Sequence, residues 1–228
     1  MRRGGAKRLV LVAPYLCYMR QDTAFHPGEA ISQKVLGWLL SGTMDRVITV
    51  DAHLHRTKRI RDVFPGIEAE DLSATPAMFE ALRTSGLDPA TVVVGPDQES
   101  EPWVAELAKL LGVAHTVAHK IRRGDHSVEL TFPDPALLAG RPALLVDDIV
   151  SSGGTLIACA KALLAAGSRS IDAVITHALF APEMMREFND AGIRSVRSTT
   201  SVPHPSNAIA LDEILAKALR REIEGAPR

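Results

Sequence analysis

The sequence has no long apolar run. None of the uninterrupted apolar stretches in its 228 residues reaches the roughly 20 residues that a membrane-spanning helix requires. The opening residues, Met-Arg-Arg-Gly-Gly-Ala-Lys, are not followed by the apolar segment and cleavage site of a secretory signal. We therefore expect neither a membrane span nor export.

Cysteine is scarce as well. The two cysteines, Cys17 and Cys159, fall in apolar or helical segments and lack the spacing of metal ligands. We expect buried, reduced thiols at both positions, and with them a cytoplasmic location.

The sequence also carries almost no net charge. Lysine and arginine together number 26 and aspartate and glutamate 27, which leaves a formal net charge of −1. This balance argues against nucleic acid or any other general polyanion as a partner, so positive charge at a phosphate site has to be local. Apolar residues are plentiful at 46%, enough to bury the core of one or two globular domains.

The most informative stretch runs from Ala143 to Leu156. An apolar run typical of a buried parallel strand leads to two adjacent carboxylates, Asp147 and Asp148. A loop of small residues follows, made of Ser151, Ser152, Gly153, Gly154 and Thr155. Its backbone N–H groups fit around a phosphate at a helix N-terminus, and the carboxylates suit ribose hydroxyls. An ordinary strand, turn and helix with a Ser or Thr cap is the alternative.

The order of the expected elements predicts an α/β protein. Strands are expected at 8–13, 46–50, 91–95, 114–118, 142–146, 171–176 and 194–198, with an extended stretch at 128–132 and a polar segment at 120–127. Helices are expected at 29–40, 75–86, 101–111, 155–166, 182–190 and 211–223. This alternation predicts mainly parallel, doubly wound sheets whose ligands lie at the carboxyl ends of the strands, with a domain boundary near residue 72.

Polar residues follow several of these strands. Asp51 and His53 follow one strand, Asp97 follows another, and His177 follows a third. Since the carboxyl ends of parallel strands share one edge, we expect an active site there. For any single histidine, a satisfied interior or rim position is the more common alternative.

The segment around Asp147 resembles the phosphoribosyl-pyrophosphate (PRPP) motif of phosphoribosyltransferases and of PRPP synthetases, also called ribose-phosphate pyrophosphokinases. Five further stretches are similar to the synthetases alone. They are Pro14-Tyr-x-x-Tyr-x-Arg20-Gln21-Asp22, Ile31-Ser32, Val-Ile-Thr-Val-Asp51-x-His53, Pro96-Asp97 and Lys120-x-Arg122. Their order and spacing are also similar, so the resemblance covers nearly the whole chain and favours a PRPP synthetase of a bacterial and archaeal branch. Nothing resembles the nucleobase hood of a true phosphoribosyltransferase.

The resemblance implies two phosphoribosyltransferase-like domains, the first of them incomplete. Residues 1–72, joined by the C-terminal helix 211–228, would form a partial first domain, and residues 73–210 would form the second. PRPP synthetases normally begin about half a domain earlier, so we expect exposed strand edges in the first domain, with poor stability or pairing with another chain. The family also implies a homo-oligomer.

The resemblance also implies roles for single residues. Arg20, Gln21 and His53 would bind ATP, and His53 and Asp97 would act on Mg²⁺. A histidine is an unusual Mg²⁺ ligand, so His53 contacting only the nucleotide is the alternative. Lys120 and Arg122 would be catalytic, on a mobile loop that closes over the phosphates; a solvated basic loop is the alternative. Asp147, Asp148 and residues 151–155 would hold ribose 5-phosphate.

The implied reaction transfers the diphosphoryl group of ATP to the C1 hydroxyl of ribose 5-phosphate, giving PRPP and AMP. A non-catalytic regulatory or ligand-binding subunit is the alternative. Ser151 stands where many synthetases have a third acidic residue, which weakens the match at the sugar. No basic residue for allosteric phosphate is found around Gly28 and Glu29, so regulation by phosphate or ADP is not expected.

Overall fold

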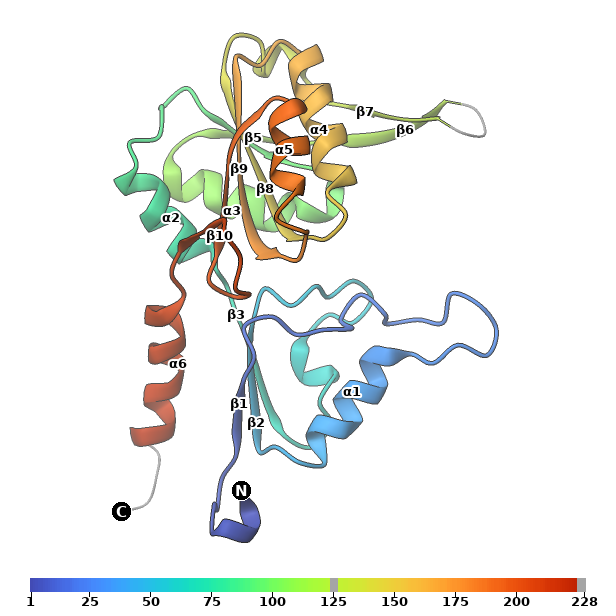
Figure 1. Ribbon diagram of the computed structural model, residues 1–228, viewed down its shortest axis with the longest axis vertical. Helices are drawn as coiled ribbons and strands as arrows, with labels where there is room; N and C mark the ends of the chain where they lie inside the picture. Colours follow the sequence, from blue (N-terminus) through green and yellow to red (C-terminus); the bar gives the residue numbers. More distant parts are fainter. Residues whose placement is uncertain (124–126, 225–228) are drawn as a thin grey trace. The chain divides into compact units, whose positions relative to one another are not determined.

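The computed structural model describes residues 1–123 and 127–224, with side chains for all of these except 121–123 and 127–129. The chain divides into two compact units. Unit 1 consists of Met1–Ser73 and Asp212–Arg228, and unit 2 of Ala74–Leu211. Both combine parallel strands with helices (Figure 1). No helix of the described ranges is long and apolar enough to cross a bilayer.

Unit 2 is built on a six-stranded sheet in the order β11-β10-β9-β8-β4-β5, with every pair parallel. Its strands are β4 (Val92–Gly95), β5 (Ala114–Val117), β8 (Pro142–Val150), β9 (Ser170–Ala178), β10 (Ile193–Thr199) and β11 (Asn207–Ile209). Its helices are α2 (Thr75–Thr84), α3 (Glu101–Leu111), α4 (Gly154–Ala165) and α5 (Met184–Asp190), with short 3₁₀ turns η3 (Gln98–Ser100) and η4 (Pro135–Leu137).

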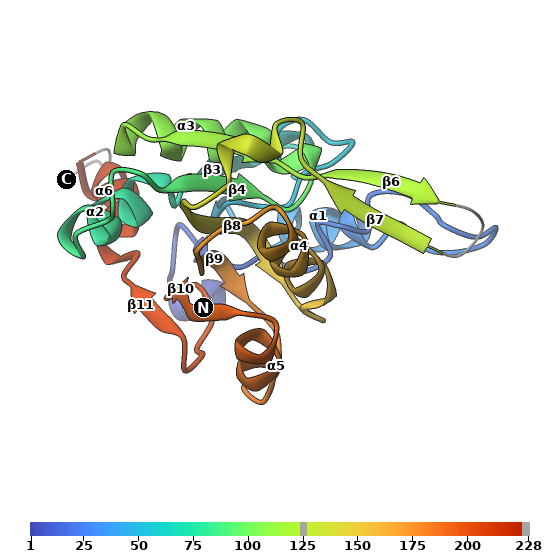
Figure 2. The ribbon, with the colours of Figure 1, turned by 90° about the horizontal axis from the view of Figure 1, so that it is seen from above.

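The helices of unit 2 cover both faces of this sheet. In Figure 2, α4 and α5 lie on one side of β8 and β9, and α3 lies on the other. Alternate strand residues such as Ala143 and Leu145 join Leu156 and Leu163 of α4 in one buried cluster. A sheet buried on both faces explains the nearly continuous apolar runs of its central strands.

Two strands of unit 2 are longer than the sequence predicts. β8 continues past Val146 to Val150, so Asp147 and Asp148 lie within the strand and do not follow it. β9 continues to Ala178 and includes His177. The pairing of Ile149 with His177 and of Val150 with Ala178 carries both strands toward the same edge.

The polar segment after β5 forms an antiparallel pair of strands, β6 (His119–Arg123) and β7 (Ser127–Thr131), visible in Figure 1. Lys120 pairs in register with Leu130, and Arg122 with Val128. The expectation of a loop is therefore wrong at Lys120 and Arg122. Residues 124–126, between the two strands, lie outside the described chain.

Unit 1 contains a three-stranded parallel sheet in the order β1-β2-β3. Its elements are η1 (Arg2–Gly4), β1 (Val10–Val12), α1 (Ser32–Ser41), β2 (Arg46–Val50), η2 (Ile60–Asp62), β3 (Glu68–Leu72) and α6 (Asp212–Glu224). Val47 of β2 lies in a small core with Phe64 and Val63, against which Leu36 and Leu40 of α1 pack.

The buried face of α1 differs from the expected one. The spacing of apolar residues in the sequence predicts one face made of Ile31, Val35, Leu36, Leu39 and Leu40. Leu36 and Leu40 do pack against the core, but Val35 and Leu39 are exposed, as is Trp38 beside them. The helix instead turns Gly37 inward, where an added Cβ would lie 2.0 Å from the carbonyl oxygen of Val63. This close backbone approach fixes the rotation of α1 and leaves the alternative apolar face in solvent.

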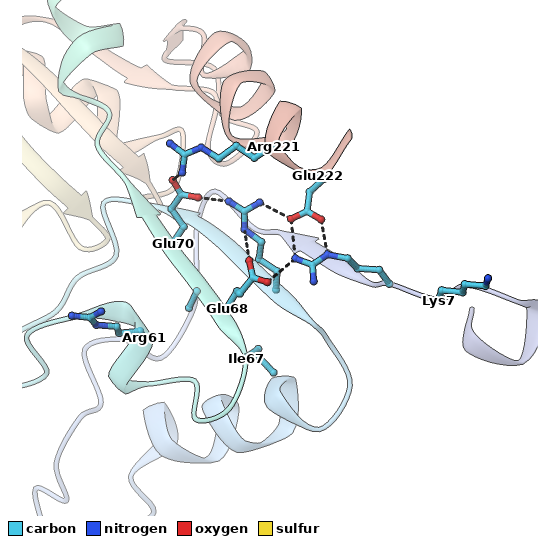
Figure 3. Close-up of a pocket in the computed structure, with 10 residues that line it drawn as sticks. Lys7, Arg61, Ile67, Glu68, Glu70, Arg221 and Glu222 are labelled. Atoms are coloured by element: carbon cyan, nitrogen blue, oxygen red, sulfur yellow. Dashed lines mark hydrogen bonds and ion pairs between the residues drawn. The ribbon is translucent and has the colours of Figure 1, made fainter. Parts of the chain in front are cut away.

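A cluster of charged side chains joins α6 to the sheet of unit 1 (Figure 3). Arg46 of β2 has a side chain only 5% exposed, and its Nη1 lies 2.6 Å from Oε1 of Glu222. Its Nη2 is bonded to Glu70 of β3. Arg8 closes the cluster with its Nε 2.6 Å from Oε2 of Glu222. Ion pairs thus join the C-terminal helix to the strands of unit 1.

One cysteine is placed as expected and the other is not. Cys159 of α4 is fully buried, whereas Cys17 is exposed. Cys17 lies between Leu16 and Met19, and these two side chains occupy the core of unit 1 in its place. The thiol of Cys17 therefore faces outward.

Candidate active site

The junction of β8 and α4 has the geometry of an anion cradle. Gly153 caps α4 with a left-handed φ of 71°, and it offers no side chain to the helix N–H groups. The residues around it, Ser151, Ser152, Gly154 and Thr155, are exposed. Because the first N–H groups of a helix have no intrahelical partner, this turn presents donors and a partial positive charge to an anion.

Gly153 also packs closely against two apolar side chains, Phe188 and Met184. A Cβ on this residue would lie 2.7 Å from Cε1 of Phe188 and 2.8 Å from Cε of Met184. Phe188 packs edge-on against Phe180 with ring centroids 5.0 Å apart. The turn therefore rests on an apolar wall that leaves no room for a side chain at position 153.

The two carboxylates at the end of β8 differ in environment. Asp148 is buried, while Asp147 is half-buried and its Oδ1 accepts a hydrogen bond of 3.0 Å from the N–H of Asp148. Burial, then the charges of Asp147 and Asp97, raise the pKa of the Cys159 thiol to about 12. β4 and β8 are parallel neighbours, so the carboxyl ends of both strands lie at one rim of the sheet.

Asp97 follows β4 at this rim. Its Oδ1 accepts a hydrogen bond of 3.1 Å from the N–H of Glu99, and its Oδ2 lies 3.7 Å from Nζ of Lys120. Ser100 donates to the carbonyl oxygen of Asp97 at 2.5 Å. The structure thus brings one predicted metal ligand, Asp97, and one predicted catalytic cation, Lys120, together. The side chain of Arg122 lies outside the described residues.

In unit 1, the other predicted residues lie on loops held by a buried polar network. Arg20 and Gln21 are exposed, and His53 is half-buried in the turn after β2. Between the two loops, the carboxylate of Asp22 accepts bonds of 2.8 Å from both the N–H and Nη1 of Arg56. Burial opposes the charge of Asp22, but the bonds from Arg56 hold the pKa of this carboxyl below its ordinary value.

Gln33 is part of this network and was not predicted from sequence. Its Nε2 donates to the carbonyl oxygen of Met19 at 3.1 Å, and its Oε1 accepts from the hydroxyl of Thr57 at 2.8 Å. The signal available was a glutamine on the face of α1 that carries Leu36 and Leu40. This side chain ties the loop before α1 to the segment after His53.

Among the described residues of unit 1, two that are not glycine have left-handed backbones. They are Tyr18, with φ 64°, and Asp51, with φ 41°. Tyr18 precedes Arg20 by two residues, and Asp51 precedes His53 by two. The N–H of Asp51 donates to the carbonyl oxygen of Leu72, which holds the second turn in place. Strain of this kind concentrates at functional sites, so both loops are candidates for ligand contact.

The predicted metal ligands are divided between the units, with His53 in unit 1 and Asp97 in unit 2. Among the residues that the structure describes, no three His, Cys, Asp or Glu side chains form a ready metal site. Mg²⁺ commonly uses only one or two protein carboxylates and takes its other oxygens from phosphates and water. The oxygens of Asp97 fit that pattern.

Comparison with known proteins finds a matching family model and similar proteins. The family model of the phosphoribosyl transferase domain matches residues 77–213, which places unit 2 in that class of fold. The ribose-phosphate pyrophosphokinase of Methanopyrus kandleri is 32% identical over 220 residues, covering 96% of this chain and 73% of that protein. The corresponding protein of Methanobrevibacter smithii is 31% identical, covering 95% and 74%. The chain therefore belongs to the ribose-phosphate pyrophosphokinase family of enzymes.

A solved structure supports the same assignment. The crystal structure of phosphoribosylpyrophosphate synthetase from Mycobacterium smegmatis matches with a TM-score of 0.84 and 25% sequence identity. The match covers 99% of this chain and 74% of that one. The mainly parallel α/β fold of the chain is thus that of the family.

Proposed function

We propose that this chain transfers the diphosphoryl group of ATP to the C1 hydroxyl of ribose 5-phosphate, releasing AMP and forming PRPP. The observation that carries the proposal is the β8–α4 junction, where Asp147 and Asp148 precede an exposed, glycine-capped helix N-terminus. The names of the relatives support the same reaction. In it, the C1 oxygen bonds to the β-phosphorus of ATP, the bond from that phosphorus to the bridging oxygen of AMP breaks, and the hydroxyl proton is released.

In unit 2, the sugar phosphate would bind at the junction. The 5-phosphate would accept hydrogen bonds from the turn of residues 151–155. Asp147 and Asp148 would accept hydrogen bonds from the ribose hydroxyls and so orient C1. Lys120, and Arg122 beside it on β6, would stabilise the negative charge that develops on the leaving AMP oxygen.

In unit 1, Arg20 and Gln21 would contact ATP, and Arg20 would add positive charge at its phosphates. Mg²⁺ would neutralise phosphate charge when it is bound. Asp97 is the residue whose carboxylate oxygens suit this ion. In the structure, Nζ of Lys120 lies 3.7 Å from Oδ2 of Asp97. His53 would contact the ion or the nucleotide; a hard cation prefers oxygen, which favours the nucleotide.

The direct test uses purified protein with Mg·ATP and ribose 5-phosphate, and follows the products by ³¹P NMR. We expect AMP and PRPP in equal amounts, and no AMP when ribose 5-phosphate is left out. ADP as the nucleotide product would mean that a single phosphoryl group is transferred, which contradicts the proposal. Ribose 5-phosphate binding without AMP formation in the presence of ATP and Mg²⁺ would favour a ligand-binding protein.

We also propose that the chain works as a cytoplasmic homo-oligomer, as the family resemblance implies. The exposed apolar side chains Val35, Trp38 and Leu39 on α1 support self-association, because exposed apolar surface of this kind marks contact sites. Sedimentation equilibrium tests it. A single species of monomer mass at micromolar concentration would contradict the proposal.

A further inference from the structure

Unit 2 carries a cavity at the edge of its sheet opposite the β8–α4 junction. The strands are parallel, so all their amino ends lie along one edge. The cavity, of about 510 Å³, lies at these ends, lined by Thr91 before β4, Pro142 of β8 and Ser170 of β9. Residues 85–88, which follow α2, form another side. None of these residues belongs to the proposed active site.

Arginine side chains dominate the charge of this cavity. Its charged lining residues are Arg169, Arg194, Arg197, Asp88 and Asp172. Arg169 is paired with Asp88, and Nη2 of Arg194 lies 2.5 Å from Oδ2 of Asp172. Oδ1 of Asp172 accepts a hydrogen bond of 2.7 Å from Ser195. Both carboxylates are thus already neutralised, and one positive charge remains in excess.

That remaining charge is on Arg197. Its side chain is half-buried on β10 and lines the cavity, and no other described residue forms a hydrogen bond or ion pair with it. The register pairs Ser195 with Asp172 and Arg197 with Val174, so Arg197 lies on the same face of the sheet as Asp172. A partly desolvated guanidinium without a counter-ion is unfavourable, and an anion in the cavity would relieve this cost.

We propose that this cavity binds a phosphate dianion, free or as a phosphomonoester, with Arg197 as its principal ligand. A guanidinium group donates two parallel hydrogen bonds to phosphate oxygens, which makes arginine the preferred phosphate ligand. The hydroxyl of Ser170, which has no hydrogen bond to another described residue, would donate to a third oxygen. The ion pairs to Asp88 and Asp172 hold the two flanking arginines in position.

The experiment is a titration of the ¹⁵N-labelled full chain followed by NMR, at constant ionic strength set with chloride. The probes are inorganic phosphate and glycerol 3-phosphate. We expect saturable shifts of the amides of residues 85–88, 170 and 195 in the wild type. Arg197→Gln should weaken binding at these amides at least about tenfold. The amides of residues 151–155 provide an internal reference, because the proposed active-site phosphate should still bind there.

Two further variants make the test specific. Arg186→Gln removes the same charge from an exposed position on α5 and should leave the cavity shifts unchanged. Arg197→Lys keeps the positive charge but loses the paired donors of the guanidinium, so it should bind phosphate more weakly than the wild type. This variant keeps the test possible if Arg197→Gln does not fold. Stronger binding of one probe identifies the free ion or the ester as the source. The proposal would be overturned if neither probe gave saturable shifts at the cavity amides. It would also be overturned if the Arg197 variants bound the probes as tightly as the wild type.

Discussion

Gly153 has two independent reasons to be glycine: a φ of 71° and a Cβ position 2.7 Å from Phe188. We expect Gly153→Ala to lower the free energy of unfolding by about 2–3 kcal/mol, because it combines backbone strain with overpacking. It should also weaken ribose 5-phosphate binding, since the turn has to move away from Phe188. Urea denaturation and calorimetric titration measure the two effects.

Gly154→Ala provides the matched control for stability. A Cβ at position 154 would meet only Oγ of Ser152, at 3.9 Å, and the backbone there is not left-handed. The free energy of unfolding should therefore change by no more than about 0.5 kcal/mol. Equal destabilisation by both alanines would show that the wall behind Gly153 is not the cause.

Lys120 tests the catalytic proposal at a single side chain. Lys120→Ala should lower kcat about 10²-fold, because one cation that stabilises the leaving oxygen is lost. Folding should be nearly unaffected, since the Lys120 side chain is 54% exposed and its ion pair with Asp97 is a surface pair. Steady-state AMP formation and thermal melting measure the two properties. Lys161→Ala, at an exposed position on α4, should behave as the wild type; near-wild-type kcat in Lys120→Ala would remove Lys120 from the mechanism.

Most candidate site residues can be proposed from the sequence because they lie in short contiguous stretches. Residues 147–155, for example, form strand end, turn and helix start without any distant partner. Gln33 was missed because its role comes from Met19 and Thr57, which are remote in sequence. The pairing of Lys120 with Asp97 depends likewise on β6 returning to the end of β4.

Helix α6 is joined to the sheet of unit 1 through Glu222. Hydrogen bonds from Arg8, then Arg46, lower the pKa of Glu222 from 4.5 to about 2. Because the folded-state pKa is depressed, the carboxylate stabilises the fold fully above about pH 4.5. This contribution should be lost as the pH falls from about 4.5 to 2. Free energies of unfolding measured at several pH values report it.

Glu222→Gln should remove this part of the pH dependence. We expect the variant to be less stable by about 1–3 kcal/mol at pH 7, because Arg46 is buried and loses a charged partner. The difference from the wild type should shrink below pH 4.5. Glu224→Gln, on an exposed position of the same helix, should keep the wild-type profile. Parallel pH profiles for Glu222→Gln and the wild type would contradict the assignment.

α1 depends on Gly37 in the same way as the junction depends on Gly153. Gly37→Ala would place a Cβ 2.0 Å from the backbone oxygen of Val63. We expect a loss of about 3 kcal/mol or more in the free energy of unfolding, although alanine favours helices over glycine. Gly42→Ala, whose Cβ would meet only carbonyl oxygens at 3.6 and 3.7 Å, is the control for urea denaturation. It should be nearly neutral.

The periodicity of apolar residues predicts most strands and helices. It fails where contacts with residues distant in sequence determine whether a segment forms a strand or which face of a helix is buried. β3 reads Glu-Ala-Glu-Asp-Leu, which has little strand character; Arg46 and Arg221 neutralise Glu70 and allow it to pair with β2. On α1, apolar residues occur on two faces, and only the close approach of Gly37 to Val63 decides which one is buried. β6 was too polar to be predicted as a strand, and its pairing with β7 supplies the missing hydrogen bonds.

The two units have separate cores, around Val47 in unit 1 and around Leu145 in unit 2. We therefore expect more than one transition in a calorimetric melt, because multidomain proteins commonly depart from two-state unfolding. Gly37→Ala should lower the transition of unit 1 alone, and Gly153→Ala that of unit 2 alone.

The double variant Gly37→Ala, Gly153→Ala shows whether the units unfold separately. Sites without shared partners give additive effects, so each transition should fall as far as in the matching single variant, within about 0.5 kcal/mol. Ribose 5-phosphate should raise only the transition that Gly153→Ala lowers, because a ligand stabilises the part of the protein that binds it. A single transition lowered by either alanine and raised by ribose 5-phosphate would mean that the two cores unfold as one cooperative structure.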